Sequence, residues 1–341
     1  MRPWKDFEVI PIPLSLKLLV PGYRAVWLRR CRAVIDHINQ FDPSLTFGED
    51  GDGPWLQLPT GGPRLHGFPT DPGKAEVHRI ISPAFHRDVP VERFRLVLDY
   101  INRYLYPHLR PDLRPSGYSE SQMFGFHGQQ KDELRVSPEE RRVALLEIFR
   151  PKRNEVVIDC GPFLGFGEVR ISPELGQGRV IAVEASEPCY RRLSRNLSEN
   201  GISNVTALHR AVWNCETEIE LKTGHAQANS VFEDIALGRD IQKVKTVTID
   251  GVARDQGLER VDVISLTLNG AELEAIDGAH QVLTNLRPRI RAAGWYLRDG
   301  EPIWLHLTRR LEPFGYVCLS GTRGGFFAFP KELLETDGGN K

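Results

Sequence analysis

The sequence lacks the signals of a membrane, secreted or disulfide-linked protein. No run reaches the roughly 18 apolar residues that a membrane span needs, and three prolines and Lys17 interrupt the apolar stretch near the amino terminus, so no cleavable signal is apparent. The five cysteines are scattered and include no C-x-x-C pair, which argues against disulfides and a structural zinc. We expect a soluble cytoplasmic protein without stable membrane insertion.

An excess of charge of one sign is also lacking. The chain has 44 lysines and arginines against 45 aspartates and glutamates, a net charge of −1. No overall field therefore favours a nucleic acid or an anionic membrane. His78 and His86 have no further ligands at metal-binding spacing. We predict no nucleic-acid partner and no bound metal.

Two phosphate-binding glycine patterns are missing, although the chain has 31 glycines. Neither G-x-G-x-x-G nor G-x-x-x-x-G-K-[ST] occurs. What is present is an apolar run from Glu155 that ends in Asp159-x-Gly161-x-x-x-Gly165-x-Gly167, in which Pro162 offers no backbone N–H for a phosphate. An apolar run that ends in an acid and a glycine predicts a buried parallel strand and a tight loop.

A second apolar run, 180–184, ends in Glu184 at the spacing of a βαβ unit. An acid at such a strand end can accept hydrogen bonds from two ribose hydroxyls. An acid before the first glycine suits a positively charged ligand, and S-adenosylmethionine carries an ammonium and a sulfonium. We expect Asp159, Gly161, Gly165 and Glu184 to bind this cofactor at the carboxyl edge of the sheet. The alternative is a nucleotide-free α/β domain with a glycine-rich turn.

Strands and helices alternate from residue 155 onward. The last two predicted strands are close together and form a hairpin. A mostly parallel α/β sheet that ends in an antiparallel hairpin is the class I methyltransferase arrangement, a Rossmann-like fold. The predicted strands are 155–159, 179–184, 204–208, 261–267, 288–293, 316–319 and 325–329, the helices are 187–199, 271–284 and 299–313, and an extra β pair is 217–222 and 243–248.

Proline divides the chain, since 16 of its 24 prolines fall in the first 150 residues. We predict that residues 1–135 form an irregular α+β extension packed on a domain at 136–333, with a polar tail at 334–341. The extension is expected to hold a hairpin at 55–68 and helices near 18–40, 73–81 and 91–105.

Three stretches resemble the FkbM-type family of S-adenosylmethionine-dependent methyltransferases, over about residues 141–294. The first, Val157-Ile-Asp-Cys-Gly-Pro-Phe-Leu-Gly165, is similar to V-D-x-G-A-x-x-G, and the second, Val183-Glu-Ala-Ser-Glu-Pro188, is similar to the family's glutamate-containing second strand. The third runs from Val247-Thr-Ile-Asp250 to Gly270-Ala-Glu-Leu-Glu-Ala-Ile-Asp-Gly278 and is similar to T-L-D-x-L followed by K-I-D-V-E-G-A-E-L. The third stretch is the most specific. Asp250 within it also stands where a helix N-cap is expected.

The third stretch departs from the family at the strand end. The family's K-I-D-V-E-G is Ser265-Leu-Thr-Leu-Asn-Gly270 in this chain. Thr267 and Asn269 can orient a hydroxyl or the cofactor's amino group, but they cannot abstract a proton. A hydroxyl acceptor benefits from a nearby base, and the candidates by sequence position are Glu272, His209 and His225. A dipole-compensating role for Glu272 and structural roles for the histidines are the alternatives.

The resemblance implies methyl transfer from S-adenosylmethionine to a hydroxyl of a small molecule or saccharide. Because acids expected at the strand ends are replaced by Thr267 and Asn269, the alternative is a non-catalytic domain that keeps the fold and acts as a binding or scaffolding module. The sequence leaves the acceptor and homo-oligomerisation open.

Overall fold

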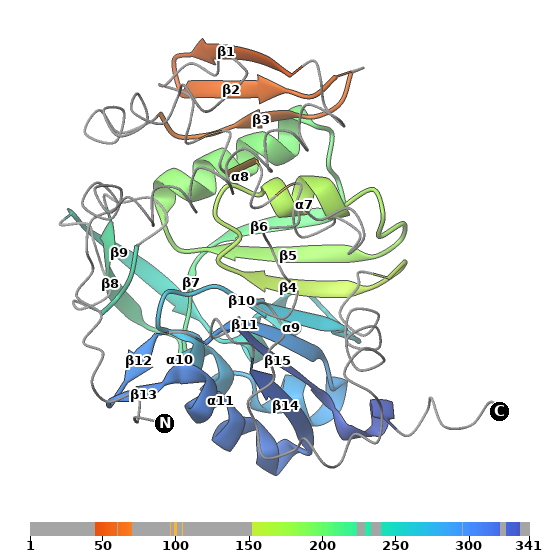
Figure 1. Cartoon of the computed structure of the whole chain (residues 1–341), viewed down its shortest axis with the longest axis vertical. Coiled ribbons are helices and arrows are strands. Elements are labelled where there is room, and N and C mark those ends of the chain that lie inside the picture. Colours follow the sequence, from red (N-terminus) through yellow and green to blue (C-terminus); the bar gives the residue numbers. More distant parts are fainter. Residues whose placement is uncertain are drawn as a thin grey trace, which may run out of the picture. The chain divides into compact units, whose positions relative to one another are not determined.

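The chain divides into two compact units, Met1–Tyr118 and Ser119–Lys341, in the computed structural model (Figure 1). The described residues are 45–59, 61–69, 96, 99, 100, 104, 152–223, 229–232, 240–294, 296–320 and 325–334. The predicted boundary at residue 135, the tail beyond residue 334 and the predicted helices near 18–40 and 73–81 lie outside these ranges. None of the helices within them combines the length and the apolar character that crossing a membrane requires.

The first unit contains a small antiparallel sheet. Strands β1 (Thr46–Asp50), β2 (Gly53–Gln57) and β3 (Arg64–His66) pair in that order, and the hairpin predicted over 55–68 is confirmed. Leu56 and Leu65 are paired across β2 and β3 and are fully buried. The guanidinium of Arg64 lies 4.4 Å from the centre of the Trp55 ring, a cation–π contact. Strand β1 was not predicted.

Helical residues of the first unit fall where a helix was predicted, at 91–105. Leu96, Asp99, Tyr100 and Tyr104 are helical. Leu96 and Tyr100 are four residues apart and fully buried, as expected of side chains on one helix face. The Tyr100 ring stacks on Tyr104, with ring centroids 5.4 Å apart.

A seven-stranded sheet forms the centre of the second unit, in the order β14-β15-β11-β10-β4-β5-β6. Neighbouring strands are parallel except where β15 pairs with β11 and β14. All seven predicted strands are present, and the class I methyltransferase arrangement is confirmed. The bounds are β4 Val156–Cys160, β5 Arg179–Glu184, β6 Val205–His209, β10 Val263–Leu266, β11 Arg289–Ala293, β14 Tyr316–Ser320 and β15 Gly325–Pro330.

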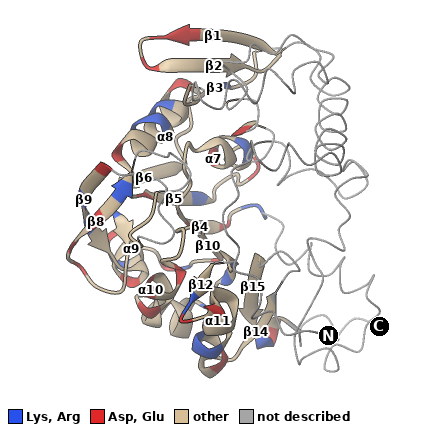
Figure 2. Cartoon of the chain, turned by 60° about the vertical axis from the view of Figure 1, so that its left-hand side comes forward, with Lys and Arg blue, Asp and Glu red and all other residues tan. Residues whose placement is uncertain are grey.

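Helices cover both faces of this sheet (Figure 1). Within the described ranges they are α7 Phe166–Ile171, α8 Glu187–Glu199, α9 Ile249–Asp255, α10 Glu272–Asp277 and α11 Ile303–Leu311, with a π-helix at Val282–Leu286 and 3₁₀ turns at Glu312–Phe314 and Lys331–Leu334. Helices α7 and α8 lie together on one face, and α9, α10 and α11 share a buried core with the other face. Basic and acidic residues lie along α8 (Figure 2). Arg191 and Glu187 form an exposed ion pair of i,i+4 spacing on this helix.

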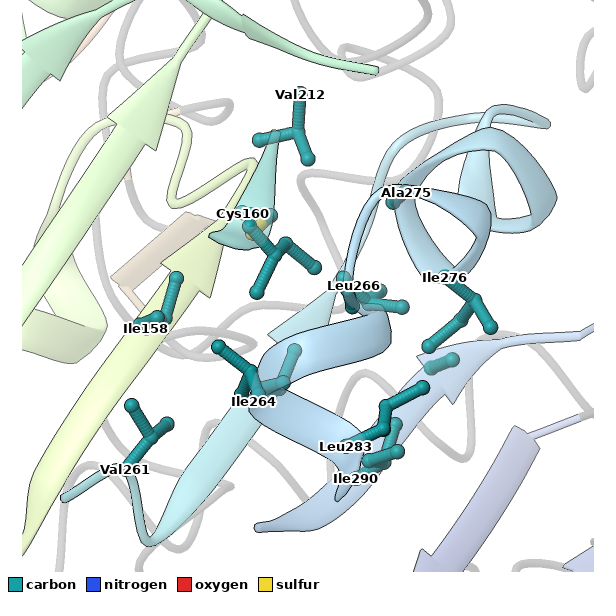
Figure 3. Close-up of a cluster of buried hydrophobic side chains, with 14 of the residues drawn as sticks. Ile158, Cys160, Val212, Val261, Ile264, Leu266, Ala275, Ile276, Leu283 and Ile290 are labelled. Carbon is teal, nitrogen blue, oxygen red and sulfur yellow. The ribbon is translucent and has the colours of Figure 1, made fainter. Parts of the chain in front are cut away.

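On the second face of the sheet, buried side chains of neighbouring strands lie side by side. Ile158, Ile264 and Ile290 are paired across β4, β10 and β11 and have no exposed surface. Ile276 of α10 and Leu283 of the π-helix belong to the same cluster (Figure 3). Successive side chains of a strand point to opposite faces, so the odd-numbered Asp159 lies away from this core.

Two smaller β elements complete the unit. Strands β7 (Ala211–Val212), β9 (Asp240–Val247) and β8 (Glu218–Thr223) form a sheet in that order, which confirms the extra β pair predicted at 217–222 and 243–248. Strands β12 (Leu297–Arg298) and β13 (Glu301–Pro302) form a short hairpin before α11.

Two helical predictions differ from the structure. The helix predicted at 271–284 is divided at Gly278, where a Cβ atom would lie 2.4 Å from the carbonyl oxygen of Trp213. Asp250 does not cap its own helix, because the hydroxyl of Thr248 accepts the N–H of Gly251 there. The Asp250 carboxylate instead accepts the N–H groups of Gln281 and Val282, each at 2.9 Å. It caps a segment that only the fold brings beside it.

Candidate active site

The carboxyl ends of β4 and β5 bring the predicted cofactor residues together. These strands are parallel neighbours, with Asp159 paired to Ala182 and Cys160 to Val183, so Asp159 and Glu184 lie at the same edge of the sheet. Strand β4 is an inner strand of the sheet. Strands β5 and β6 follow it on one side, and β10 lies on its other side. This reversal of strand order is where open α/β sheets bind ligands.

The loop after β4 depends on two glycines with left-handed backbone. Gly161 has φ 85°, and a Cβ atom there would lie 2.2 Å from the carbonyl oxygen of Thr267. Gly165 has φ 75°, and a Cβ atom would lie 2.4 Å from the side chain of Leu193 in α8. Asn196 of α8 donates from its side-chain amide to the carbonyl oxygen of Leu164, at 2.8 Å. The loop is thus held between β10 and α8.

The side chain of Glu184 is fixed by backbone groups. Its Oε2 accepts the N–H of Phe163 at 3.1 Å, and its Oε1 accepts the N–H of Ser186 at 2.9 Å. Phe163 has φ 63°, a left-handed conformation that is uncommon for a residue with a bulky side chain. These two bonds orient both carboxylate oxygens of Glu184 at the edge of the sheet.

A second carboxyl lies beside Asp159. Glu168, in the first turn of α7, is 2% exposed and lies beside Asp159, which is 7% exposed. Burial raises the pKa of the Glu168 carboxyl well above its ordinary value, and the charge of Asp159 raises it further. Arg291 of β11 opposes this shift, with a guanidinium nitrogen 3.8 Å from an Asp159 oxygen. Glu168 was not predicted as a site residue, although an acid between buried Phe166 and Val169 could have indicated it.

Thr267 and Asn269 follow β10, and their side chains have different surroundings. Thr267 is exposed, beside the glycine loop, and its N–H donates to the carbonyl oxygen of Cys160 at 2.9 Å. Asn269 has φ 51°, and its side chain donates to the Asn229 carbonyl oxygen at 2.9 Å and accepts from the Tyr296 hydroxyl at 2.8 Å. Asn269 therefore connects the inserted segment at 229–232 to the segment after β11.

Positive charge near this strand end is balanced within the protein. The Arg298 guanidinium donates to the carbonyl oxygen of Gly270 at 3.0 Å and pairs with the Glu274 carboxylate at 2.8 Å. It also lies 4.2 Å from the centre of the Phe232 ring. Arg298 and Tyr296 were not predicted as site residues, because they contact the β10 end only through the fold.

Glu272 is fully buried at the start of α10. Its Oε1 accepts the N–H of Leu268 at 2.8 Å, and its Oε2 accepts the N–H of Gly270 at 2.9 Å. Burial raises the pKa of Glu272 to about 7, while the backbone hydrogen bonds oppose that rise. Both carboxylate oxygens thus hold the loop between β10 and α10.

His209 lies at the end of β6, paired with Glu184 in the strand register. Its Nε2 is 3.2 Å from the carbonyl oxygen of Ala185, and its ring stacks on Tyr190. His209 is therefore on the Glu184 side of the sheet edge. His225 is outside the described residues. In the part of the chain that the structure describes, no group of three or more His, Cys, Asp or Glu side chains could hold a metal ion.

Known proteins with similar sequences are methyltransferases. Residues 168–318 match the family model of the methyltransferase FkbM domain. Methyltransferase sdnD of Sordaria araneosa is 26% identical over 160 aligned residues, a match that covers 38% of this chain and 61% of sdnD. The chain thus spans less than two thirds of that relative.

Two solved structures are similar to parts of this chain. A SAM-dependent methyltransferase from Aquifex aeolicus is 18% identical with a TM-score of 0.33, covering 59% of this chain and 92% of its own. Aeropyrum pernix fibrillarin, solved with bound S-adenosyl-L-methionine, is 13% identical with a TM-score of 0.35, covering 56% and 73%. The sequence match and the strand order agree with the resemblance seen in the motifs. Residues 168–318 of this chain are thus similar to the FkbM domain of methyltransferases.

Proposed function

We propose that this protein transfers a methyl group from S-adenosylmethionine to a hydroxyl of a small molecule or saccharide. The observation that carries the proposal is the placement of Asp159 and Glu184 at the ends of adjacent parallel strands, with the glycine loop between them. Strand ends of this kind form nucleoside sites in open α/β sheets.

The residues at this edge suit the cofactor. S-adenosylmethionine supplies an electrophilic methyl group on a sulfonium. Glu184, held by two backbone N–H groups, would accept hydrogen bonds from the ribose hydroxyls. Asp159 would hold the amino group, because a carboxylate stabilises a nearby ammonium. Gly161 and Gly165 let the backbone approach the ligand without a Cβ atom.

The acceptor would lie at the end of β10. Thr267 is the exposed hydroxyl beside the glycine loop, and it can orient an acceptor hydroxyl by donating or accepting a hydrogen bond. For Asn269 and Glu272 we propose a positioning role, since their side chains hold the loop after β10. For His209 we propose a place on the ribose side, next to Glu184.

The acceptor hydroxyl must give up its proton as the methyl group transfers. Thr267 and Asn269 cannot take it, and both oxygens of Glu272 accept backbone N–H groups. We therefore propose His225 as the general base. His225→Gln should lower turnover by roughly 10²–10⁴-fold with unchanged cofactor affinity, whereas an unchanged rate would remove His225 from the mechanism.

One observation favours a second function, a non-catalytic binding module. Asn269 stands where the family has a glutamate, and both ends of its amide are used within the protein. A domain of this kind would bind S-adenosylmethionine without consuming it.

The decisive experiment combines calorimetric titration with S-adenosylmethionine and a radiolabelled methyl-transfer assay. The acceptors should be a set of hydroxylated small molecules and oligosaccharides, with matched deoxy or O-methylated forms as controls and an RNA as a further arm. We expect cofactor binding and labelling of a free hydroxyl only. Binding without labelling of any acceptor supports the non-catalytic module, labelling of the RNA overturns the proposed acceptor class, and the absence of cofactor binding overturns both functions.

A further inference from the structure

We propose that Glu168 is a second carboxyl that binds the amino group of the cofactor together with Asp159, and that this pair releases a proton when the cofactor binds. The inference rests on the proposed function, since it requires S-adenosylmethionine at the carboxyl edge of β4. It adds a residue outside the glycine loop and a change in protonation that the methyl transfer itself does not need.

The geometry of Glu168 carries the proposal. Its side chain is almost fully buried, it contacts Asp159, and its Oε2 accepts no hydrogen bond from any described residue. A buried carboxyl oxygen without a partner loses its hydration and gains no hydrogen bond in return. An amino group placed beside Asp159 would supply that hydrogen bond. Other polar side chains near α7 have partners within the protein. Asn204 forms hydrogen bonds with Ser172, and Arg170 forms an ion pair with Glu174.

The charges around the pair determine how many protons it holds. Asp159 comes from β4 and Glu168 from α7, and Arg291 of β11 places a guanidinium nitrogen 3.8 Å from an Asp159 oxygen. The side chain of Arg291 is 46% exposed, so water screens its charge. Two carboxylates in contact resist ionising together. The free protein therefore keeps a proton on Glu168, through which Glu168 can donate a hydrogen bond to Asp159.

Ligand binding changes this balance. An ammonium group beside the pair stabilises the second carboxylate and lowers the proton affinity of Glu168. The O–H bond of the carboxyl group breaks, the carboxylate keeps the electron pair, and the proton passes to a water or buffer base of the solvent. Cofactor affinity should consequently rise with pH by up to tenfold per pH unit below the pKa of Glu168 and level off above it.

Calorimetric titration of the full-length protein in phosphate and in Tris tests this coupling, because the two buffers differ in ionisation enthalpy. From about pH 6 to about pH 7.5, below the ordinary pKa of an α-amino group, S-adenosylmethionine and S-adenosylhomocysteine should each release up to one proton, since both bring the amino group as an ammonium. Methylthioadenosine lacks that group and should release none. Release by methylthioadenosine, or no release by the two amino-bearing ligands at any pH, would overturn the proposal.

Glu168→Gln is the matching variant. Glutamine imitates the protonated acid and can still donate a hydrogen bond to Asp159, so the variant should bind the cofactor with an affinity that no longer changes with pH and with no proton release. Glu174→Gln is the control, because Glu174 pairs with Arg170 at the exposed end of α7 and its loss should leave the release unchanged. Unaltered pH dependence in Glu168→Gln would assign the proton to another group.

Asp159→Asn covers the case in which Glu168→Gln does not fold. Removing the Asp159 charge should move the proton release to lower pH, and release at the wild-type pH would contradict the proposal. Failure of the wild-type protein to bind S-adenosylmethionine at all would instead overturn the proposed function. Binding without any coupled proton rejects only the role of Glu168.

Discussion

The hydroxyl of Tyr296 donates a hydrogen bond to Oδ1 of Asn269, 2.8 Å away, and ties the segment after β11 to the end of β10. The same amide donates to the carbonyl oxygen of Asn229. Asparagine can do both because its side chain has one acceptor oxygen and one donor nitrogen. A glutamate, which the family has at this position, could accept from Tyr296 but could not donate to Asn229.

Asn269→Asp tests this connection. The carboxylate should keep the bond to Tyr296 and lose the donor to Asn229, leaving two acceptors face to face. We expect a loss of about 1–3 kcal/mol in the free energy of unfolding, measured by urea denaturation. Asn285→Asp is the matched control, since the exposed Asn285 donates to the side chain of the exposed Gln281, and it should cost less than about 0.5 kcal/mol. Equal effects would mean that the Asn229 contact contributes nothing.

Glu184→Ala should weaken S-adenosylmethionine binding by about 1.5–3 kcal/mol, roughly 10- to 150-fold, because hydrogen bonds to a charged acceptor contribute on that scale. Calorimetric titration measures the effect. Glu187→Ala provides the control, since that side chain pairs with exposed Arg191. Thermal unfolding of both variants separates lost ligand contacts from lost support of Phe163 and Ser186. An unchanged affinity would contradict the assignment of Glu184 to the cofactor.

Gly161→Ala should destabilise the domain by several times the cost of Gly257→Ala. Both glycines have positive φ, 85° and 56°. An added Cβ meets nothing within 4 Å at Gly257, so strain alone costs about 1–2 kcal/mol there. At Gly161 the Cβ would also collide with the carbonyl oxygen of Thr267, which directly follows the neighbouring strand β10. Similar urea midpoints for the two variants would show that the loop can move away from β10.

The free energy of unfolding should decrease as pH rises, because the buried carboxyl of Glu272 ionises. Its pKa is about 7 in the folded protein and near 4.3 in the unfolded chain, so folding is favoured while the group is protonated. The stabilisation is complete below about pH 4 and is lost as pH rises through about 7, amounting to roughly 3 kcal/mol. Glu272→Gln cannot ionise, so the difference in unfolding free energy between wild type and variant should change by this amount between about pH 4.5 and pH 7.5. A constant difference would show that Glu272 ionises normally.

Much of the fold could be predicted from the sequence. Strand and helix periodicity, together with the acid–glycine strand ends at Asp159 and Glu184, indicated the seven strands and the antiparallel ending that the structure has. Helix α8 has the predicted bounds, 187–199. Short helices were harder to predict. Helix α7 has only six residues after the glycine loop, which is too short for a clear apolar periodicity. The capping partner of Asp250 was also hidden, because Gln281 and Val282 are about thirty positions away.

Local sequence patterns were enough to predict the order of strands and helices, the glycine loop and the two acids at neighbouring strand ends. Periodicity and turn chemistry are local properties, and parallel strands bring their carboxyl ends to one edge. Three other features became visible in the folded chain alone. Glu168 lies beside Asp159, Asn269 joins Asn229 to Tyr296, and both oxygens of Glu272 accept backbone N–H groups. Hydrogen-bond partners and burial set the charge and freedom of a polar side chain, and both come from residues that are distant in the sequence.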